Sequence, residues 1–244
     1  LVQSLIPFNA GMAFGRISGT TSVEVKSGAT LKGEQGIALQ AHSQNTLTVE
    51  SEATNGHDAE GKQATTTGFA FAMANTGLTT SAKVNSGALL NTRGDVSLLA
   101  LTEQAIRNKA VFKSLGNGAA GGAVLALSVL NSNTQATFNA NLSGARHLDV
   151  SATNLISRQQ NEATSQAGKG LADFLKFRAI GTVDPIKNYV LSKFKDVNPT
   201  QPTDSKFRLA ASLGLVVSDQ QTEASIGQST QLNLSGNLGL TALQ

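Results

Sequence analysis

The sequence predicts an all-β protein built as a β-solenoid, with a short helical insertion near residues 166–208. Two observations carry this prediction: one block of sequence recurs along the chain, and apolar residues fall at every second position within each copy. The clearest copy is residues 82–100, AKVNSGALLNTRGDVSLLA, and further copies lie at residues 23–41, 136–152 and 224–242. Internal repetition of this kind is typical of proteins in which similar units stack on one another.

The four copies align, and each consists of two alternating apolar segments separated by a short turn rich in Gly, Ser or Asn. The matching residues are Leu31, Leu90, Leu142 and Leu232; Ile37, Val96, Leu148 and Leu238; Leu39, Leu98, Val150 and Leu240; and Ala41, Ala100, Ala152 and Ala242. A period of two predicts strands, because successive side chains of a strand point to opposite faces. We therefore expect Leu, Ile, Val and Ala to face inward, in columns along the stack, and polar residues to face outward.

We expect residues 1–244 to form a single β-solenoid segment of a longer chain. Its repeat units span about 11–67, 68–121 and 122–165 plus 209–244. Such units bury their apolar faces only against neighbouring units, so stability is distributed along the array.

Within the units, each block is preceded by a further alternating run. The first unit has Met12 and Phe14, then a break rich in Ser, Thr and Gly, and the second has Phe69, Phe71 and Met73. We expect each unit to hold about five or six short strands, or two or three turns of the solenoid, and the chain to form about a dozen coils in a rod roughly 55 Å long.

Composition excludes several kinds of site. Charged residues make up 14% of the chain and aromatic residues 5%, and there is no Cys, so neither disulfides nor thiolate metal sites can form. The segment from Lys169 to Arg208 has eight basic and four acidic residues, and the remainder, with 11 basic and 12 acidic residues, is close to neutral. A near-neutral body is a poor cradle for nucleic acid, so we expect no nucleic-acid partner. No window is long and apolar enough for a membrane span, so we expect no membrane insertion in this segment.

The insertion is predicted to be helical. Asp184 and Pro185 are suited to the cap and the first position of a helix, and the apolar residues that follow recur at helical spacing. One interpretation is a helical outcrop that packs its apolar stripe on the solenoid. The other makes its lysine-rich outer face, with Lys187, Lys193 and Lys195, a contact site for an acidic glycan, a lipid or a neighbouring subunit.

The sequence gives little support for a catalytic site or a metal site. A glycosidase needs two carboxylates about 5–9.5 Å apart, and the densest acidic pairs, Glu50 with Glu52 and Asp58 with Glu60, are interpreted as solvated surface. The three histidines are isolated in sequence: His42, His57 and His147. We therefore expect no catalytic residues, no metal and no cofactor.

One tripeptide is a candidate contact. Arg93, Gly94 and Asp95 fall at the corner between the two strand segments of the second copy, an exposed kind of turn that integrins recognise. The other copies carry different residues near this corner, so the alternative is a variable turn that faces solvent.

The cadence of the repeats resembles the large repetitive exoproteins of Gram-negative bacteria, the filamentous-haemagglutinin-like adhesins and leukotoxin-type autotransporter or two-partner-secreted proteins. The resemblance lies in SGALLNTRGDVSLLALTE and SGATLKGEQGIALQA, and in the insertion that begins Asp184-Pro-Ile-Lys-Asn-Tyr-Val. It covers nearly the whole chain and implies a right-handed parallel β-helix, export to the cell surface or the medium, and service as a stalk or adhesive fibre. It carries no catalytic residues to this chain.

The function expected from these observations is a non-enzymatic structural or adhesive rod segment of a giant bacterial surface or secreted adhesin. Its partners would be glycans or matrix on a host or neighbouring cell. One alternative is a subunit of a self-assembling extracellular filament whose open coil ends associate by strand addition. Another is a carbohydrate-active β-helix with a groove beside the insertion.

Overall fold

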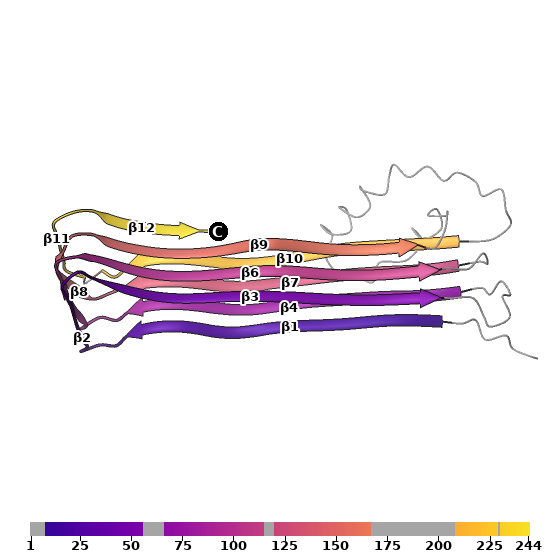
Figure 1. The fold of residues 1–244 in the computed structure, drawn as a ribbon, viewed down its shortest axis with the longest axis horizontal. Helices are drawn as coiled ribbons and strands as arrows, with labels where there is room; N and C mark the ends of the chain where they lie inside the picture. Colours follow the sequence, from indigo (N-terminus) through magenta and orange to yellow (C-terminus); the bar gives the residue numbers. More distant parts are fainter. Residues whose placement is uncertain (1–7, 56–65, 115–119, 167–207, 229) are drawn as a thin grey trace, which may run out of the picture.

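The computed structural model describes residues 8–55, 66–114, 120–166, 208–228 and 230–244. The predicted helical insertion therefore lies almost wholly outside the described residues. These residues form strands joined by short turns, and the strands build four coils of the same design (Figure 1). In each coil a long strand leads to a short strand, and a second strand then runs back beside the first.

The strands of the four coils follow one another in the same order along the chain. They are β1 (Phe8–Val25), β2 (Thr30–Gly33) and β3 (Gly36–Asn55); β4 (Thr66–Val84), β5 (Leu89–Thr92) and β6 (Asp95–Ser114); β7 (Ala120–Phe138), β8 (Asn141–Ala145) and β9 (Leu148–Gln166); and β10 (Arg208–Ile226), β11 (Leu232–Leu234) and β12 (Leu238–Leu243).

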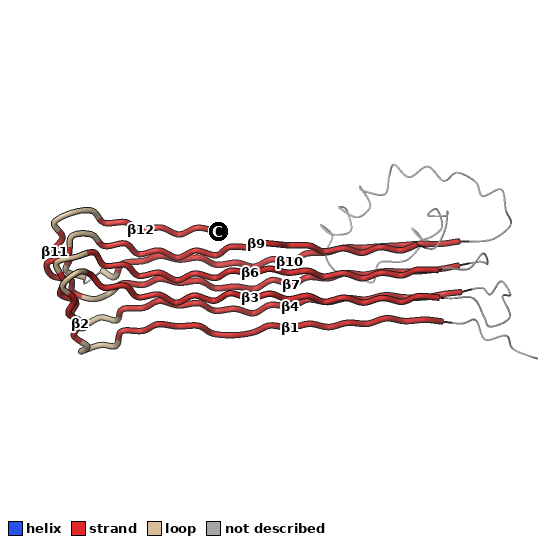
Figure 2. The backbone as a smooth tube through the Cα atoms, viewed as in Figure 1, coloured by secondary structure: helices blue, strands red, loops and turns tan. Residues whose placement is uncertain are grey.

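Equivalent strands of successive coils pair in parallel and form three sheets. Sheet A has the order β1-β4-β7-β10, sheet B has β11-β8-β5-β2, and sheet C has β12-β9-β6-β3. Sheets A and C run the length of the coil, and the short strands of sheet B join them at one end, here called the short-strand end (Figure 2). The prediction of an all-β parallel β-solenoid is thus confirmed.

The columns predicted from the sequence are confirmed residue by residue. In sheet B, Leu31, Leu90, Leu142 and Leu232 are neighbours in successive strands. In sheet C, the same holds for the three columns that begin at Ile37, Leu39 and Ala41. Their side chains face the interior, where Leu90 and Leu98 are fully buried.

The predicted number of coils is wrong. Each repeat unit forms one coil rather than two or three, because its alternating runs belong to long strands such as the 19-residue β4. At usual spacings such a strand is about 60 Å long, whereas each added coil advances the stack by only about 5 Å. The described part is therefore a broad, flat stack of four coils and not a slender rod of a dozen.

The break rich in Ser, Thr and Gly that follows Phe14 in the sequence lies inside β1 and does not separate two strands. Its Thr21 belongs to a column that continues through Thr80, Thr134 and Thr222 in sheet A. The hydroxyl of Thr102, opposite on sheet C, lies 2.7 Å from those of both Thr80 and Thr134. Buried threonines that hydrogen-bond to one another thus lie in the middle of long strands, although the sequence around them is as polar as that of a loop.

The interior accordingly has three zones along the strands. The short-strand-end core is built around Val84, Leu90, Val96, Leu98, Phe138, Leu142, Leu148 and Val150. A buried polar belt follows, formed by Thr76, Thr80, Thr102, Gln104, Ser132, Thr134 and Asn154. The far-end core lies beyond it, around Ala70, Ala72, Ala74, Ile106, Ala110, Phe112, Val124, Ala126 and Leu130.

Candidate binding face

The outer face of sheet A is apolar over the far end of the coils. In β4 the alternation buries Ala70, Ala72 and Ala74, so that the larger Phe71 and Met73 between them point outward. The outward positions of β7 and β10 also hold bulky residues, although Val124 and Leu130 of β7 face inward. The expectation that Leu and Val always face inward is therefore wrong in this part of sheet A.

The outward residues of this zone form one patch across all four coils, here called the apolar patch. It consists of Met12 and Phe14 in β1; Phe69, Phe71 and Met73 in β4; Leu125, Leu127 and Val129 in β7; and Leu213, Leu215 and Val217 in β10. Met12 is 65% exposed and Phe14 is 69% exposed, both far above what an apolar side chain shows in a core. A contiguous exposed patch of this kind marks an interaction surface more often than scattered apolar residues do.

Phe71 lies at the centre of the aromatic part of the patch. Its ring centroid is 5.2 Å from that of Phe14 in the neighbouring coil, with the planes tilted by 56°. It is 6.3 Å from that of Phe69 in the same strand, with the planes nearly parallel. Separations of this size are favourable for aromatic pairs, so the rings hold one another in place on an open sheet surface.

Small inward residues explain why the bulky ones point outward here. Gly68 and Gly122 both face Phe112, and a Cβ atom at either position would overlap its ring. Phe112 is completely buried. Phe112 thus fills the space that Gly68 and Gly122 leave open, and the bulky residues of β4 at this end lie on the outer face.

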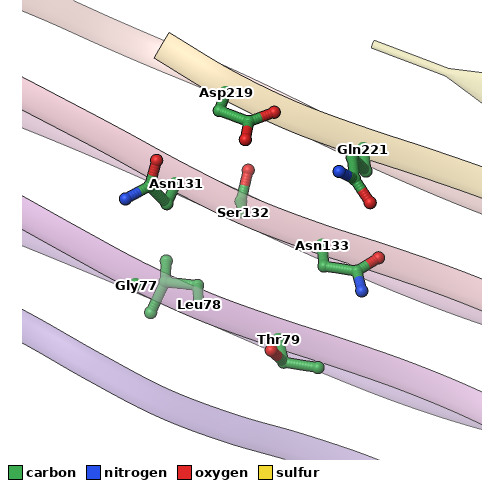
Figure 3. A pocket seen from close by; sticks show the side chains of 8 residues that line it. All are labelled: Gly77, Leu78, Thr79, Asn131, Ser132, Asn133, Asp219 and Gln221. Atoms are coloured by element: carbon green, nitrogen blue, oxygen red, sulfur yellow. The ribbon is translucent and has the colours of Figure 1, made fainter. Parts of the chain in front are cut away.

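A shallow depression borders the apolar patch on the same face of sheet A (Figure 3). Gly77, which lacks a side chain, lies in it, and Asn131, Asn133, Asp219 and Gln221 contribute polar groups from β7 and β10. Amide and carboxylate groups of this kind can donate and accept hydrogen bonds. The depression is open to solvent and holds no pair of carboxylates, so it has the character of a contact surface rather than of a catalytic cleft.

The outer face of sheet C is different, because charged residues pair across its strands. Arg107 in β6 lies 3.2 Å from Glu50 in β3, and Lys113 lies 2.9 Å from Glu52. The hydrogen bond from Lys113, together with one from Thr54, lowers the pKa of Glu52 below its ordinary value. Glu50 and Glu52 therefore occur in surface ion pairs, as the solvated-surface interpretation expects.

The tripeptide Arg93-Gly94-Asp95 lies at the turn between β5 and β6, at the short-strand end. Arg146, in the next coil, donates two hydrogen bonds to the Asp95 carboxylate, at 2.8 and 2.7 Å, and its backbone N–H donates to the carbonyl of Gly94 at 3.0 Å. The hydrogen bonds from Arg146 lower the pKa of Asp95. A contact role for the tripeptide stays a prediction, and any ligand would have to compete with Arg146 for this carboxylate.

The remaining predicted residues are dispersed or undescribed. Lys187, Lys193 and Lys195 lie outside the described residues, as do His57, Asp58 and Glu60. His42 is on the outer face of sheet C near Glu103, and His147 accepts a hydrogen bond from the backbone N–H of Asn237 at the short-strand end. The described ranges contain no group of three His, Asp or Glu side chains that could hold a metal ion. They also contain no helix long and apolar enough to cross a membrane.

The apolar patch was not identified from the sequence, although a signal for it is present. In β4 the bulky residues Phe69 to Met73 occupy odd positions, whereas the buried Ala82 and Val84 of the same strand occupy even ones. Such a change of phase within one uninterrupted strand means that the two runs face opposite sides. The change is visible only when both runs are assigned to one strand.

Comparisons with known proteins do not assign the chain. No protein-family model matches it. No curated protein and no solved structure matches it either.

Proposed function

We propose that this chain is a non-enzymatic structural segment of a large bacterial surface or secreted adhesin, with the organisation of the filamentous-haemagglutinin-like and leukotoxin-type exoproteins that it resembles. One observation carries the proposal: the four coils place like residues in the same columns of all three sheets. A stack of this kind is extended by adding coils, each of which buries its apolar face only against its neighbours.

The shape of the coil supports a display role. Each coil adds about 60 Å of strand to both outer faces and only about 5 Å to the stack, so much of the chain goes into flat surface. Contacts that are weak singly become strong when repeated on neighbouring coils, because the second contact forms at high effective concentration. The partners that fit are glycans or matrix on a host or neighbouring cell.

The test is adhesion of the folded stack. Beads that carry the purified protein are washed over surfaces of cells, glycans or matrix, and retention is compared with that of bare beads. We expect retention by the wild type and its loss in Leu90→Asp, which places a charge in the buried column of sheet B. Asn91→Asp is the matched control, because the neighbouring Asn91 is exposed. Retention no better than that of bare beads overturns the adhesive role.

Turnover measurements separate the proposal from a carbohydrate-active enzyme. We expect no product from a panel of polyuronates and neutral polysaccharides. Turnover that is lost in Asp219→Asn, at the depression on sheet A, would establish catalysis and remove the structural proposal. A groove beside the insertion would supply two further acids, Asp173 and Asp184, which lie outside the described residues. Their replacement by Asn tests that groove in the same way.

A further inference from the structure

We propose that the outer face of sheet A is a self-association surface, on which two copies of this chain pack sheet against sheet through the apolar patch. The proposal goes beyond the adhesive role and does not depend on it. It rests on the extent of the patch, on its flatness and on two charged residues at its border.

The extent of the patch suits an interface. The eleven residues of the patch, each covering about 4.8 by 6.8 Å of the sheet, occupy roughly 360 Å². That is within the range of the largest patch that monomeric proteins leave exposed, and such patches are often functional. A standard interface buries about 800 Å² on each partner, and the small polar residues that continue the same flat face toward the short-strand end can supply the difference.

Arg16 and Asp219 lie on the two outer strands of sheet A, both at the border of the patch that is nearer the short-strand end. Arg16 is the next outward residue after Phe14 in β1, and Asp219 is the next after Val217 in β10. Because β1 and β10 are the two outer strands of sheet A, three strand spacings, about 14 Å, separate these residues within one copy. Within the described part of the chain, neither side chain has an ion-pair partner.

A two-fold axis parallel to the strands pairs these charges between copies. It places β1 of one copy over β10 of the other, and Arg16 then lies over Val217 of the second copy, since the two residues occupy the same row of sheet A. Asp219 is the next outward residue along that strand. Face-to-face sheets pack about 10 Å apart, a gap that an arginine side chain spans, and the symmetry forms the pair twice.

The alternative two-fold axis, perpendicular to the strands in the plane of the interface, is disfavoured. It places β1 over β1 and runs the strands of the two copies in opposite directions. With the patch centred, Arg16 then faces Ala10 of the second copy and no longer lies near Asp219. Arg16 would lose water without gaining a partner, which is costly.

The experiment measures molecular mass by sedimentation equilibrium over a wide range of protein concentration. We expect the wild type to approach twice the 25.2 kDa chain mass. Phe71→Asp should raise the dissociation constant by at least about a hundredfold, because a central aromatic residue of an interface dominates its energy. Leu99→Asp is the matched control: it makes the same kind of change in the same coil, on the outer face of sheet C, and should leave the mass unchanged.

Charge reversal tests the arrangement without disturbing the fold, since both residues are exposed. Arg16→Asp and Asp219→Arg should each weaken the dimer by about tenfold. The double variant should recover nearly the wild-type constant. A double variant as weak as either single one overturns the two-fold arrangement.

The two methionines of the chain report directly on the face, because Met12 and Met73 both belong to the apolar patch. Their oxidation by dilute peroxide, followed by mass spectrometry, should slow as the wild-type concentration rises and should not slow in Phe71→Asp.

Three outcomes overturn the proposal. They are a monomer at every concentration, a dimer that persists in Phe71→Asp, and masses that grow without limit, as expected for association through coil ends. If the protein is a monomer and its methionines are protected, another part of the same chain covers the face. Protection that needs phosphatidylcholine vesicles would place a lipid surface there.

Discussion

The two cores of the coil fill the same kind of space in opposite ways. At the short-strand end, Leu and Val residues repeat in every coil, and columns such as that of Leu90 run through the whole stack. At the far end, the inward positions of sheet A hold many Ala and Gly residues, and one buried ring, that of Phe112 in sheet C, occupies the space between Gly68 and Gly122. The buried polar belt separates the two zones.

The difference shows that a repeat protein need not repeat its packing. A repeated column shares its burial among all the coils, so each residue depends on its neighbours above and below. A single large residue among small ones concentrates the packing energy in one contact. The two cores should therefore respond differently to substitution.

The largest effect is expected from a charge in the repeated column. Leu90→Asp places a carboxylate where the wild-type side chain is completely buried, and Leu→Ala alone costs about 2–5 kcal/mol at such sites. We expect several coils to lose their protection, which limited proteolysis would reveal as new cleavage sites on both sides of the substitution. Asn91→Asp should keep the wild-type pattern. An unchanged pattern in Leu90→Asp would contradict the shared column.

At the far end, the loss of stability caused by a substitution should depend on whether the Phe112 ring is present. Gly122→Ala forces its new Cβ against Phe112 and should lower the free energy of unfolding by about 1–3 kcal/mol. In a Phe112→Leu background the same change should cost much less, since the overlapping ring is gone. Gly121→Ala, on the outward side, meets only an ordinary contact at 3.7 Å and is the control. Equal costs in both backgrounds would show that the ring is not the cause.

The polar belt should give a smaller loss. Thr102→Val keeps the shape but deprives the buried hydroxyls of Thr80 and Thr134 of the partner that each has at 2.7 Å. We expect a loss of about 1–3 kcal/mol in denaturant unfolding, whereas Thr79→Val on the outer face should change stability by less than about 0.5 kcal/mol. Simultaneous replacement of all three threonines by valine should recover most of the loss, because no hydroxyl is then left unpaired.

The smallest effect concerns the exposed ion pair at the short-strand end. The hydrogen bonds from Arg146 lower the pKa of Asp95 from its ordinary value of 3.8, so its carboxylate stabilises the fold above that value. The contribution is lost as the pH falls from 3.8 through the lowered pKa. The unfolding midpoint of Asp95→Asn should lie slightly below that of the wild type near neutral pH, and the two should coincide in strong acid. In Arg146→Gln, the pKa of Asp95 should rise back toward 3.8, which an NMR titration would measure.

The fold class and the columns were predictable because the block repeats with matching apolar positions, which specify both strand and stacking partner. Coil size was not predictable in the same way. Thr21 and its neighbours look like a loop in the sequence, whereas in the fold they lie inside β1, where Thr21 is in register with Thr80. Such pairing depends on residues far apart in the chain, for example Thr80 and Thr102.

The candidate binding face was hidden for a related reason. A period of two identifies a strand but does not specify which of its faces is buried. Phe71 points outward because its neighbours Ala70 and Ala72 are buried, and tertiary packing decides which of the two faces is buried. The Arg93 tripeptide, in contrast, was placed correctly at a turn, while the bidentate contact of Asp95 with Arg146 of the next coil required the three-dimensional stack.

The threonine column of sheet A has a consequence for how a coil joins the stack. Since alternate residues share a face, a strand that arrived two places too far along would still hide its apolar side chains. Such a slip would nevertheless carry Thr134 away from Thr102, leaving hydroxyls stranded in the dry interior. The hydrogen-bonded threonines of the second and third coils thus favour one register over others that would bury the same apolar side chains.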